Sequence, residues 1–232
     1  MELFLIIAGV LTLIGIIVGI GFWMDRIRRN ALQAVAEELG LPFYPDGFDG
    51  ALQDIGHFKL FNTGRAKKQT KAILAESEGT SLCIFDYQYT TGHGKHSQTH
   101  RQSVAAVRST ALQMTDFAMK NEGFFNKLGS LVGMQDIDFD SHPRFSKLFL
   151  LTGSDEEAVR KLFRPELLEY FETKKGISVE AGHGAFVFFN PRKKVKPEEI
   201  KQFMTTAYEI YGQLVDSVEA LSTSSTPSTP NA

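Results

Sequence analysis

The sequence predicts an α+β protein in which a single N-terminal transmembrane helix precedes one domain with a mainly antiparallel sheet and packed helices. Residues 3–24 form an apolar run without one charged side chain, which indicates the helix. Beyond this run, hairpin signals outnumber β-α-β units, which favours antiparallel pairing. The predicted parts are an anchor (1–25), a juxtamembrane helix (26–40), a domain long enough for one complete core (41–221) and a disordered tail (222–232).

The apolar run has the length of a membrane span. A helix rises about 1.5 Å per residue, so residues 3–24 extend roughly 33 Å, enough for a hydrocarbon layer of about 30 Å. A cleaved signal peptide fits poorly, because Glu2 stands in place of a basic residue and the run is too long. Trp23 suits the membrane interface, and three arginines follow it: Arg26, Arg28 and Arg29. The positive-inside rule therefore predicts a single-pass protein of the inner membrane with a cytoplasmic domain.

Gly15 and Gly19 form a G-x-x-x-G pair within the anchor. This spacing lets two membrane helices pack closely, which would give a homo-oligomer. Glycine is also common in membrane helices generally, so an unpaired anchor stays open as the alternative.

Charge and cysteine content exclude some classes of protein. The chain has 25 Lys and Arg against 27 Asp and Glu, so it lacks the basic field of a nucleic-acid-binding protein. Cys83 is the single cysteine and cannot form an internal disulfide, which agrees with a reducing compartment.

In the first half of the domain, turn and strand signals alternate. The juxtamembrane helix is predicted from apolar residues every four positions, namely Ile27, Ala31, Val35 and Leu39. Next come a strand at 57–63, a basic loop or strand entry at 65–71, and a strand at 72–75. Residues 80–91 are dense in aromatic and β-branched side chains and form the strongest predicted strand. One face carries Cys83, Phe85, Tyr87 and Tyr89, the other Leu82, Ile84, Asp86 and Gln88, and a polar strand at 96–107 completes a long hairpin.

The second half mixes strands and helices. Short strands are predicted at 117–119, 136–140 and 145–152, and a short helix at 124–132. Ser154 and Glu157 read as a capping box that opens a helix through residue 163, and Pro165 opens another through residue 174. A hairpin over 177–179 and 185–189 turns at Gly182, and a long amphipathic helix begins at Pro197.

Three phrases carry a resemblance to a known family. They are FDYQYTTGHGK at 85–95, QDIDFDSHPRFSK at 135–147 and LFRPELL at 162–168. Together they resemble a family of uncharacterised bacterial membrane-anchored proteins of unknown function. The resemblance implies a shared fold and a membrane location, and it carries over no activity, cofactor or catalytic residue.

The most enzyme-like group is an acidic one, formed by Asp136, Asp138, Asp140 and His142. Clustered carboxylates suit hard cations, so these residues are the candidate metal ligands of a metal-assisted hydrolase. The group does not match a calcium loop, because Ser141 stands where glycine is needed and Lys147 where glutamate is needed. The alternative is a set of solvated acids at a sheet edge. No G-x-S-x-G or H-E-x-x-H motif appears, so no catalytic residue is assigned and no cofactor is expected.

The hairpin tip, residues 90–100, contains no apolar residue. Its histidines match no standard zinc spacing. Because burial cannot order such a segment, we interpret it as a contact surface formed by Gly92, His93, Gly94, Lys95, His96 and His100. The alternative is an ordinary exposed hairpin end.

Two basic runs, 65–71 and 192–196, could meet anionic lipid headgroups, where each Lys or Arg contributes about 1 kcal/mol. Asp86 is expected to be hydrogen-bonded within the sheet, and Cys83 to be a small core residue. The sequence as a whole favours a membrane-tethered cytoplasmic binding or scaffold domain, to which it assigns no specific role, over an enzyme.

Overall fold

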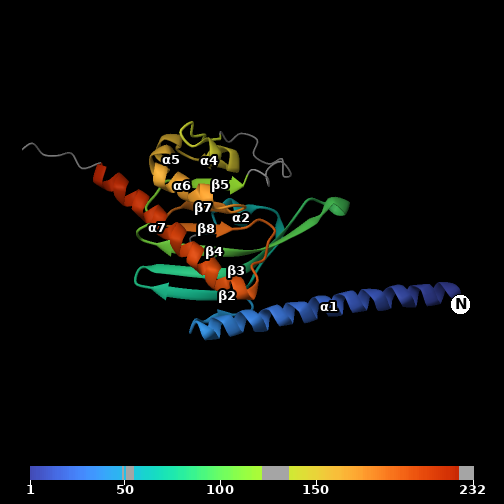
Figure 1. Cartoon of the computed structure of the whole chain (residues 1–232). Coiled ribbons are helices and arrows are strands. Elements are labelled where there is room, and N and C mark those ends of the chain that lie inside the picture. Colours follow the sequence, from blue (N-terminus) through green and yellow to red (C-terminus); the bar gives the residue numbers. More distant parts are fainter. Residues whose placement is uncertain (49, 51–54, 122–135, 225–232) are drawn as a thin grey trace, which may run out of the picture.

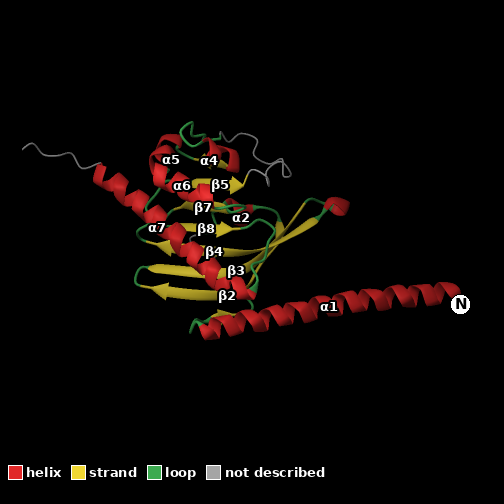
Figure 2. Ribbon diagram, in the orientation of Figure 1, coloured by secondary structure: helices red, strands yellow, loops and turns green. Residues whose placement is uncertain are grey.

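The structure is a computed structural model and describes the chain except residues 49, 51–54, 122–135 and 225–232. Its strands form one sheet in the order β1-β2-β3-β4-β8-β7-β5-β6, and every pair of neighbours is antiparallel. Helices pack on this sheet, so the predicted α+β class is confirmed (Figures 1 and 2).

The strands are β1 Phe43–Tyr44, β2 Arg65–Ser77, β3 Thr80–Thr91, β4 Gln98–Ser109, β5 Phe117–Asn121, β6 Phe149–Gly153, β7 Ser178–Gly182 and β8 Ala185–Phe189. The helices are α1 Glu2–Glu38, α2 Lys59–Asn62, α4 Pro143–Leu148, α5 Glu156–Leu162, α6 Pro165–Thr173 and α7 Ile200–Ser224. Two single 3-10 turns, η2 Gly94–His96 and η3 Pro197–Glu199, complete the described elements.

Both faces of the sheet are covered. Leu82 and Ile84 of β3 belong to the larger core cluster, which α4 to α7 and the end of α1 share. Cys83, Phe85 and Tyr87 point to the opposite face and join a second cluster with residues of α2. Side chains alternate along a strand, so the sequence predicted these two faces correctly, including the place of Cys83 in the core.

Several predicted elements agree with the structure, and three do not. Residues 57–63 form no strand, because the Asn62 side chain donates hydrogen bonds to three preceding carbonyls and closes a short helix, α2. Residues 145–152 begin as helix α4, which starts at Pro143, and only the end of the segment is strand β6. Residues 136–140 are irregular rather than a strand.

Smaller differences concern helix ends. Asp155, and not Ser154, caps α5, since its side chain accepts a hydrogen bond from the Ala158 N–H at 3.0 Å. The helix predicted at 124–132 lies outside the described residues, as does the tail from residue 225 onward, and residues 222–224 belong to α7.

Helix α1 is continuous from Glu2 to Glu38, so the predicted anchor and juxtamembrane helix are a single element. Its N-terminal part extends well beyond the sheet in Figure 1, and it is the helix in the described part of the chain that is long and apolar enough to cross a membrane. The predicted apolar stripe of residues 26–40 is displaced: Ile27 is 49% exposed, while Leu32 and Ala36 are buried against the domain.

Candidate functional site

One face of α1 contacts the domain. Asp25, Arg28, Leu32 and Ala36 follow at spacings of three or four residues, which places them on the same side of a helix. Asp25 accepts a hydrogen bond from Lys71 Nζ at 2.7 Å, and Arg28 binds both carboxylate oxygens of Asp86, through Nε and Nη2, each at 2.7 Å. We call these two ion pairs the anchor clamp.

Asp86 is the centre of the clamp and is only 5% exposed. Besides Arg28, it accepts a hydrogen bond from Ser103 Oγ at 3.0 Å and lies 3.2 Å from Lys194 Nζ. Burial alone would raise the pKa of the Asp86 carboxyl, but the hydrogen bond and charge of Arg28, with Lys194, hold this pKa below its ordinary value. The expected hydrogen bonding within the sheet is therefore present, and the sequence did not predict the partner on α1.

Lys71 reaches α1 because β2 is irregular. The register of β2 against β3 shifts between Thr70 and Ile73, and Lys71 has a φ of 56°, in the left-handed region. Such a bulge changes the direction of a side chain, and here it accompanies the Lys71 side chain, which is 5% exposed and paired with Asp25. The predicted basic loop or strand entry at 65–71 is thus the bulged start of β2.

A groove of about 800 Å³ lies between α1 and the sheet next to the clamp, and we call it the juxtamembrane groove. Val18, Gly21, Phe22 and Met24 of α1 form an apolar part of its lining. Its charged lining consists of the basic residues Arg28, Arg29, Lys68, Lys71, Arg101 and Lys194, and the acidic residues Asp25, Asp46 and Asp86. Positive charge is therefore in excess.

The hairpin tip projects from the end of the sheet beyond which α1 also extends (Figure 1). His93, Lys95 and His96 are exposed, as expected for a contact surface. Gly92 has a φ of +73°, and a side chain there would collide with the His96 carbonyl, so the turn requires glycine.

His100 does not belong to this exposed surface, because it is only 2% exposed and packs on Tyr89. Arg192 Nε donates to His100 Nδ1 at 3.0 Å, which leaves Nε2 to pair with Thr91 Oγ1 at 2.7 Å. Burial and the charge of Arg192 lower the pKa of His100, which favours a neutral ring. The prediction of His100 as a contact residue failed because polar partners on β3 and after β8 bury the imidazole.

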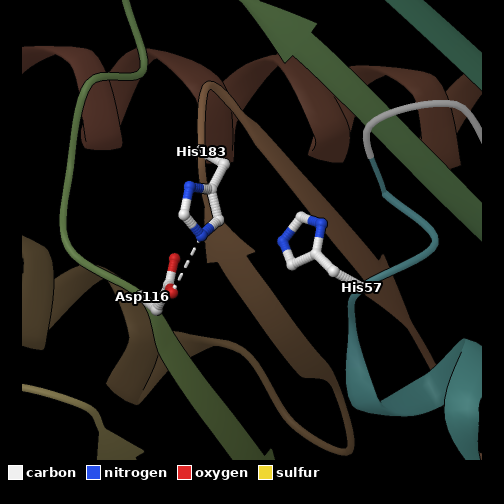
Figure 3. Close-up of side chains that lie close together, drawn as sticks. All are labelled: His57, Asp116 and His183. Carbon is white, nitrogen blue, oxygen red and sulfur yellow. Dashed lines mark ion pairs between the residues drawn. The ribbon is translucent and has the colours of Figure 1, made fainter.

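At the opposite end of the sheet, His57, Asp116 and His183 come together (Figure 3). One ligand atom from each lies within 4.8 Å of the others, and His183 Nε2 is 3.1 Å from Asp116 Oδ2. His183 sits in the β7–β8 turn with a φ of 51°. Gly182 before it permits the approach, since a Cβ there would lie 1.7 Å from Asp116 Oδ1.

A cleft of about 260 Å³ adjoins this histidine–aspartate cluster and is lined by His57, Asp116, Lys120 and Glu180, among others. Glu180 is 2% exposed, accepts a hydrogen bond from the Leu60 N–H at 3.0 Å and lies 3.9 Å from Lys120 Nζ. Burial raises the pKa of the Glu180 carboxyl. No sequence motif could reveal the cluster, because His57, Asp116 and His183 come from three distant segments.

The acidic group predicted from sequence is not assembled into a metal site. Among the described residues, Asp136, Asp138, Asp140 and His142 do not place three ligand atoms together. Asp136 Oδ1 accepts a hydrogen bond from the Leu151 N–H at 3.0 Å, and His142 pairs with the neighbouring Ser141. Asp136 and His142 therefore make local contacts in the segment that leads to α4.

Comparison with known proteins supports the fold of the chain. No protein-family model matches the chain, and no curated protein matches it. The crystal structure of the mycobacterial trehalose monomycolate transport factor A, TtfA, is similar to this chain with a TM-score of 0.58. The match covers 88% of this chain and 98% of that chain at 10% sequence identity. At this identity the likeness shows a shared fold.

Proposed function

We propose that this protein is a membrane-tethered, non-enzymatic binding domain, held in a fixed orientation against the cytoplasmic face of the inner membrane. The observation that carries the proposal is the continuity of α1, which runs from the apolar residues 3–24 directly into the anchor clamp. A helix without a break cannot act as a flexible linker. The orientation of α1 in the bilayer therefore also sets the orientation of the domain.

Other features support a contact role at the membrane. The exposed part of the hairpin tip and the basic start of β2 lie at the end of the sheet toward which the apolar part of α1 extends. Arg26, Arg28 and Arg29 beside the span favour a cytoplasmic domain. TtfA, which shares the fold, is a transport factor, and this supports a non-catalytic role. Pairing of two anchors through Gly15 and Gly19 stays part of the proposal.

Depth measurements in proteoliposomes test the orientation. Lys95→Cys at the hairpin tip is labelled with an environment-sensitive fluorophore, since the native Cys83 is buried and unreactive to a bulky probe. Lipids that carry a nitroxide in the headgroup should quench this probe strongly. The matched control is Glu78→Cys in the β2–β3 turn, which is exposed at the other end of the hairpin strands and should be quenched little. Equal quenching at both positions would contradict a fixed orientation.

A second function, binding of a divalent transition metal, is favoured by the cluster of His57, Asp116 and His183. Two imidazoles and one carboxylate suit Zn²⁺ and related ions and leave a coordination position open. This cluster replaces the acidic group at 136–142 as the candidate metal site.

Calorimetric titration of the full chain in detergent with Zn²⁺ should show one site per chain. His183→Asn should weaken the affinity at least tenfold, because asparagine tolerates the left-handed backbone of this turn but removes the imidazole ligand. His96→Asn at the hairpin tip is the control and should leave the affinity unchanged. Equal effects of both substitutions would exclude the cluster as the site.

A further inference from the structure

We propose that the juxtamembrane groove binds the phosphate headgroup of an anionic phospholipid from the surrounding bilayer, with the acyl chains of that lipid lying along α1. The inference rests on the proposed membrane-spanning role of α1. It assigns a class of ligand, an anionic phospholipid, to a groove whose lining is not needed for membrane anchoring itself.

The basic end of the groove lies at the depth of the lipid headgroups. Arg28 of α1 is fixed to Asp86 of β3. Gln88 lies two residues beyond Asp86 on β3, a rise of about 7 Å. Met24, where the apolar run ends, lies four residues before Arg28 on α1, a rise of about 6 Å. Both segments extend from the sheet in the same direction in Figure 1, so Gln88 lies near the level of the membrane boundary.

A row of side chains across three strands provides the anion site. Gln88 is the register partner of both Lys68 on β2 and Arg101 on β4, so the three lie abreast. Adjacent strands are about 4.8 Å apart, which brings a flexible lysine and an arginine to either side of one phosphate above the Gln88 amide. All three residues line the groove.

These cations are available to a ligand. Arg28 and Lys194 are engaged by Asp86, and Lys71 by Asp25. In the described part of the chain, Lys68 and Arg101 form neither an ion pair nor a side-chain hydrogen bond. Arg29, also in the groove, has among the described residues only the distant ion pair with the largely exposed Asp46, at 3.9 Å. The charge left uncompensated is therefore concentrated where the headgroup would lie.

The opposite wall of the groove selects a lipid over a soluble anion. Val18 and Phe22 are 50% and 75% exposed, and they line the same groove as the cations. Gly21 between them has no atom within 4 Å of the position of a Cβ, which leaves space for an acyl chain beside the helix. A phosphate joined to an acyl chain can contact both the basic and the apolar side of the groove, whereas a free phosphate can contact only the basic side.

Native mass spectrometry of the full chain in detergent, with defined phospholipids added, tests the assignment. Phosphatidylglycerol should be retained at least tenfold more strongly than phosphatidylcholine. The variant Lys68→Gln/Arg101→Gln should lose this preference. The control Lys67→Gln/Lys175→Gln removes two exposed charges that do not line the groove and should keep it. Gly21→Leu, which fills the apolar wall, should reduce retention of both lipids while circular dichroism stays unchanged.

Other outcomes would overturn the proposal. Equal retention of the two lipids, or an unchanged preference in Lys68→Gln/Arg101→Gln, would refute the headgroup site. Displacement of the lipid by millimolar inorganic phosphate, with Gly21→Leu unaffected, would assign the groove to soluble anions instead. Quenching of the labelled hairpin tip distinguishes failure of the lipid site from failure of the proposed function. Strong quenching without a lipid preference would refute only the lipid site in the groove. Absence of quenching would refute the fixed orientation of the domain.

Discussion

Asp86→Ala should lower the free energy of unfolding by about 3–5 kcal/mol, because it leaves the guanidinium of Arg28 buried without its partner. Arg28 is only 16% exposed, and its remaining hydrogen bonds, to the Val195 carbonyl and Ser103, cannot compensate a full charge. Chemical unfolding in mild detergent, followed by circular dichroism, measures the loss.

A double substitution distinguishes a buried ion pair from simple loss of packing. In Arg28→Met/Asp86→Leu both charges are removed and the volume is largely kept, so most of the lost stability should return. The pKa of Asp86 is lowered in the folded state, so its contribution is present above the ordinary pKa of 3.8 and is lost as the pH falls through the lower folded value. The difference between wild type and Asp86→Ala should accordingly shrink below about pH 4. A difference under about 1 kcal/mol at neutral pH would mean that water reaches the clamp.

Ile27→Pro should break the rigid connection between the span and the domain. Proline removes a helical hydrogen bond and collides with the preceding turn, at a cost of about 3 kcal/mol or more. Residue 27 lies between Asp25 and Arg28, so a kink there should separate Asp25 from Lys71 while the pair of Arg28 and Asp86 persists. Ile27 is half exposed, so little packing is lost with its side chain.

Distances between spin labels report the result of this substitution. Labels on α1 near residue 13 and at Glu78→Cys should give a narrow distance distribution in the wild type and in the control Ile27→Ala, and a broad one in Ile27→Pro. A narrow distribution in all three would show that contacts other than helix continuity fix the domain.

Local patterns were sufficient for much of the fold. β3 was predicted with its observed bounds because aromatic and β-branched residues fill it, and the β7–β8 hairpin followed from its turn glycine. The helices that begin near Pro165 and Pro197 were predicted from the position of proline in a first turn. Each of these signals lies within the element that it predicts.

Features that depend on distant residues could not be read from the sequence. α2 has strand-like composition, but Asn62 and the acceptor on Glu180 stabilise a helical turn. The clamp joins Arg28 to a residue 58 positions away, so Arg28 was visible only as a charge beside the span. The cluster of His57, Asp116 and His183 forms only when the ends of three segments meet, and neither spacing nor composition indicates such a meeting.

The hairpin and α1 together make the position of the domain depend on the thickness of the bilayer. The hairpin tip is polar and projects from the same end of the sheet as α1, so in the proposed orientation it would stop at the headgroups and limit how deeply the protein inserts. A span of roughly 33 Å adapts to a thinner hydrocarbon layer by tilting. In the proposed arrangement the clamp holds the domain rigidly on the span, so that tilt would rotate the whole sheet relative to the membrane surface. The surface that the domain presents to its surroundings would thus depend on the thickness of the membrane.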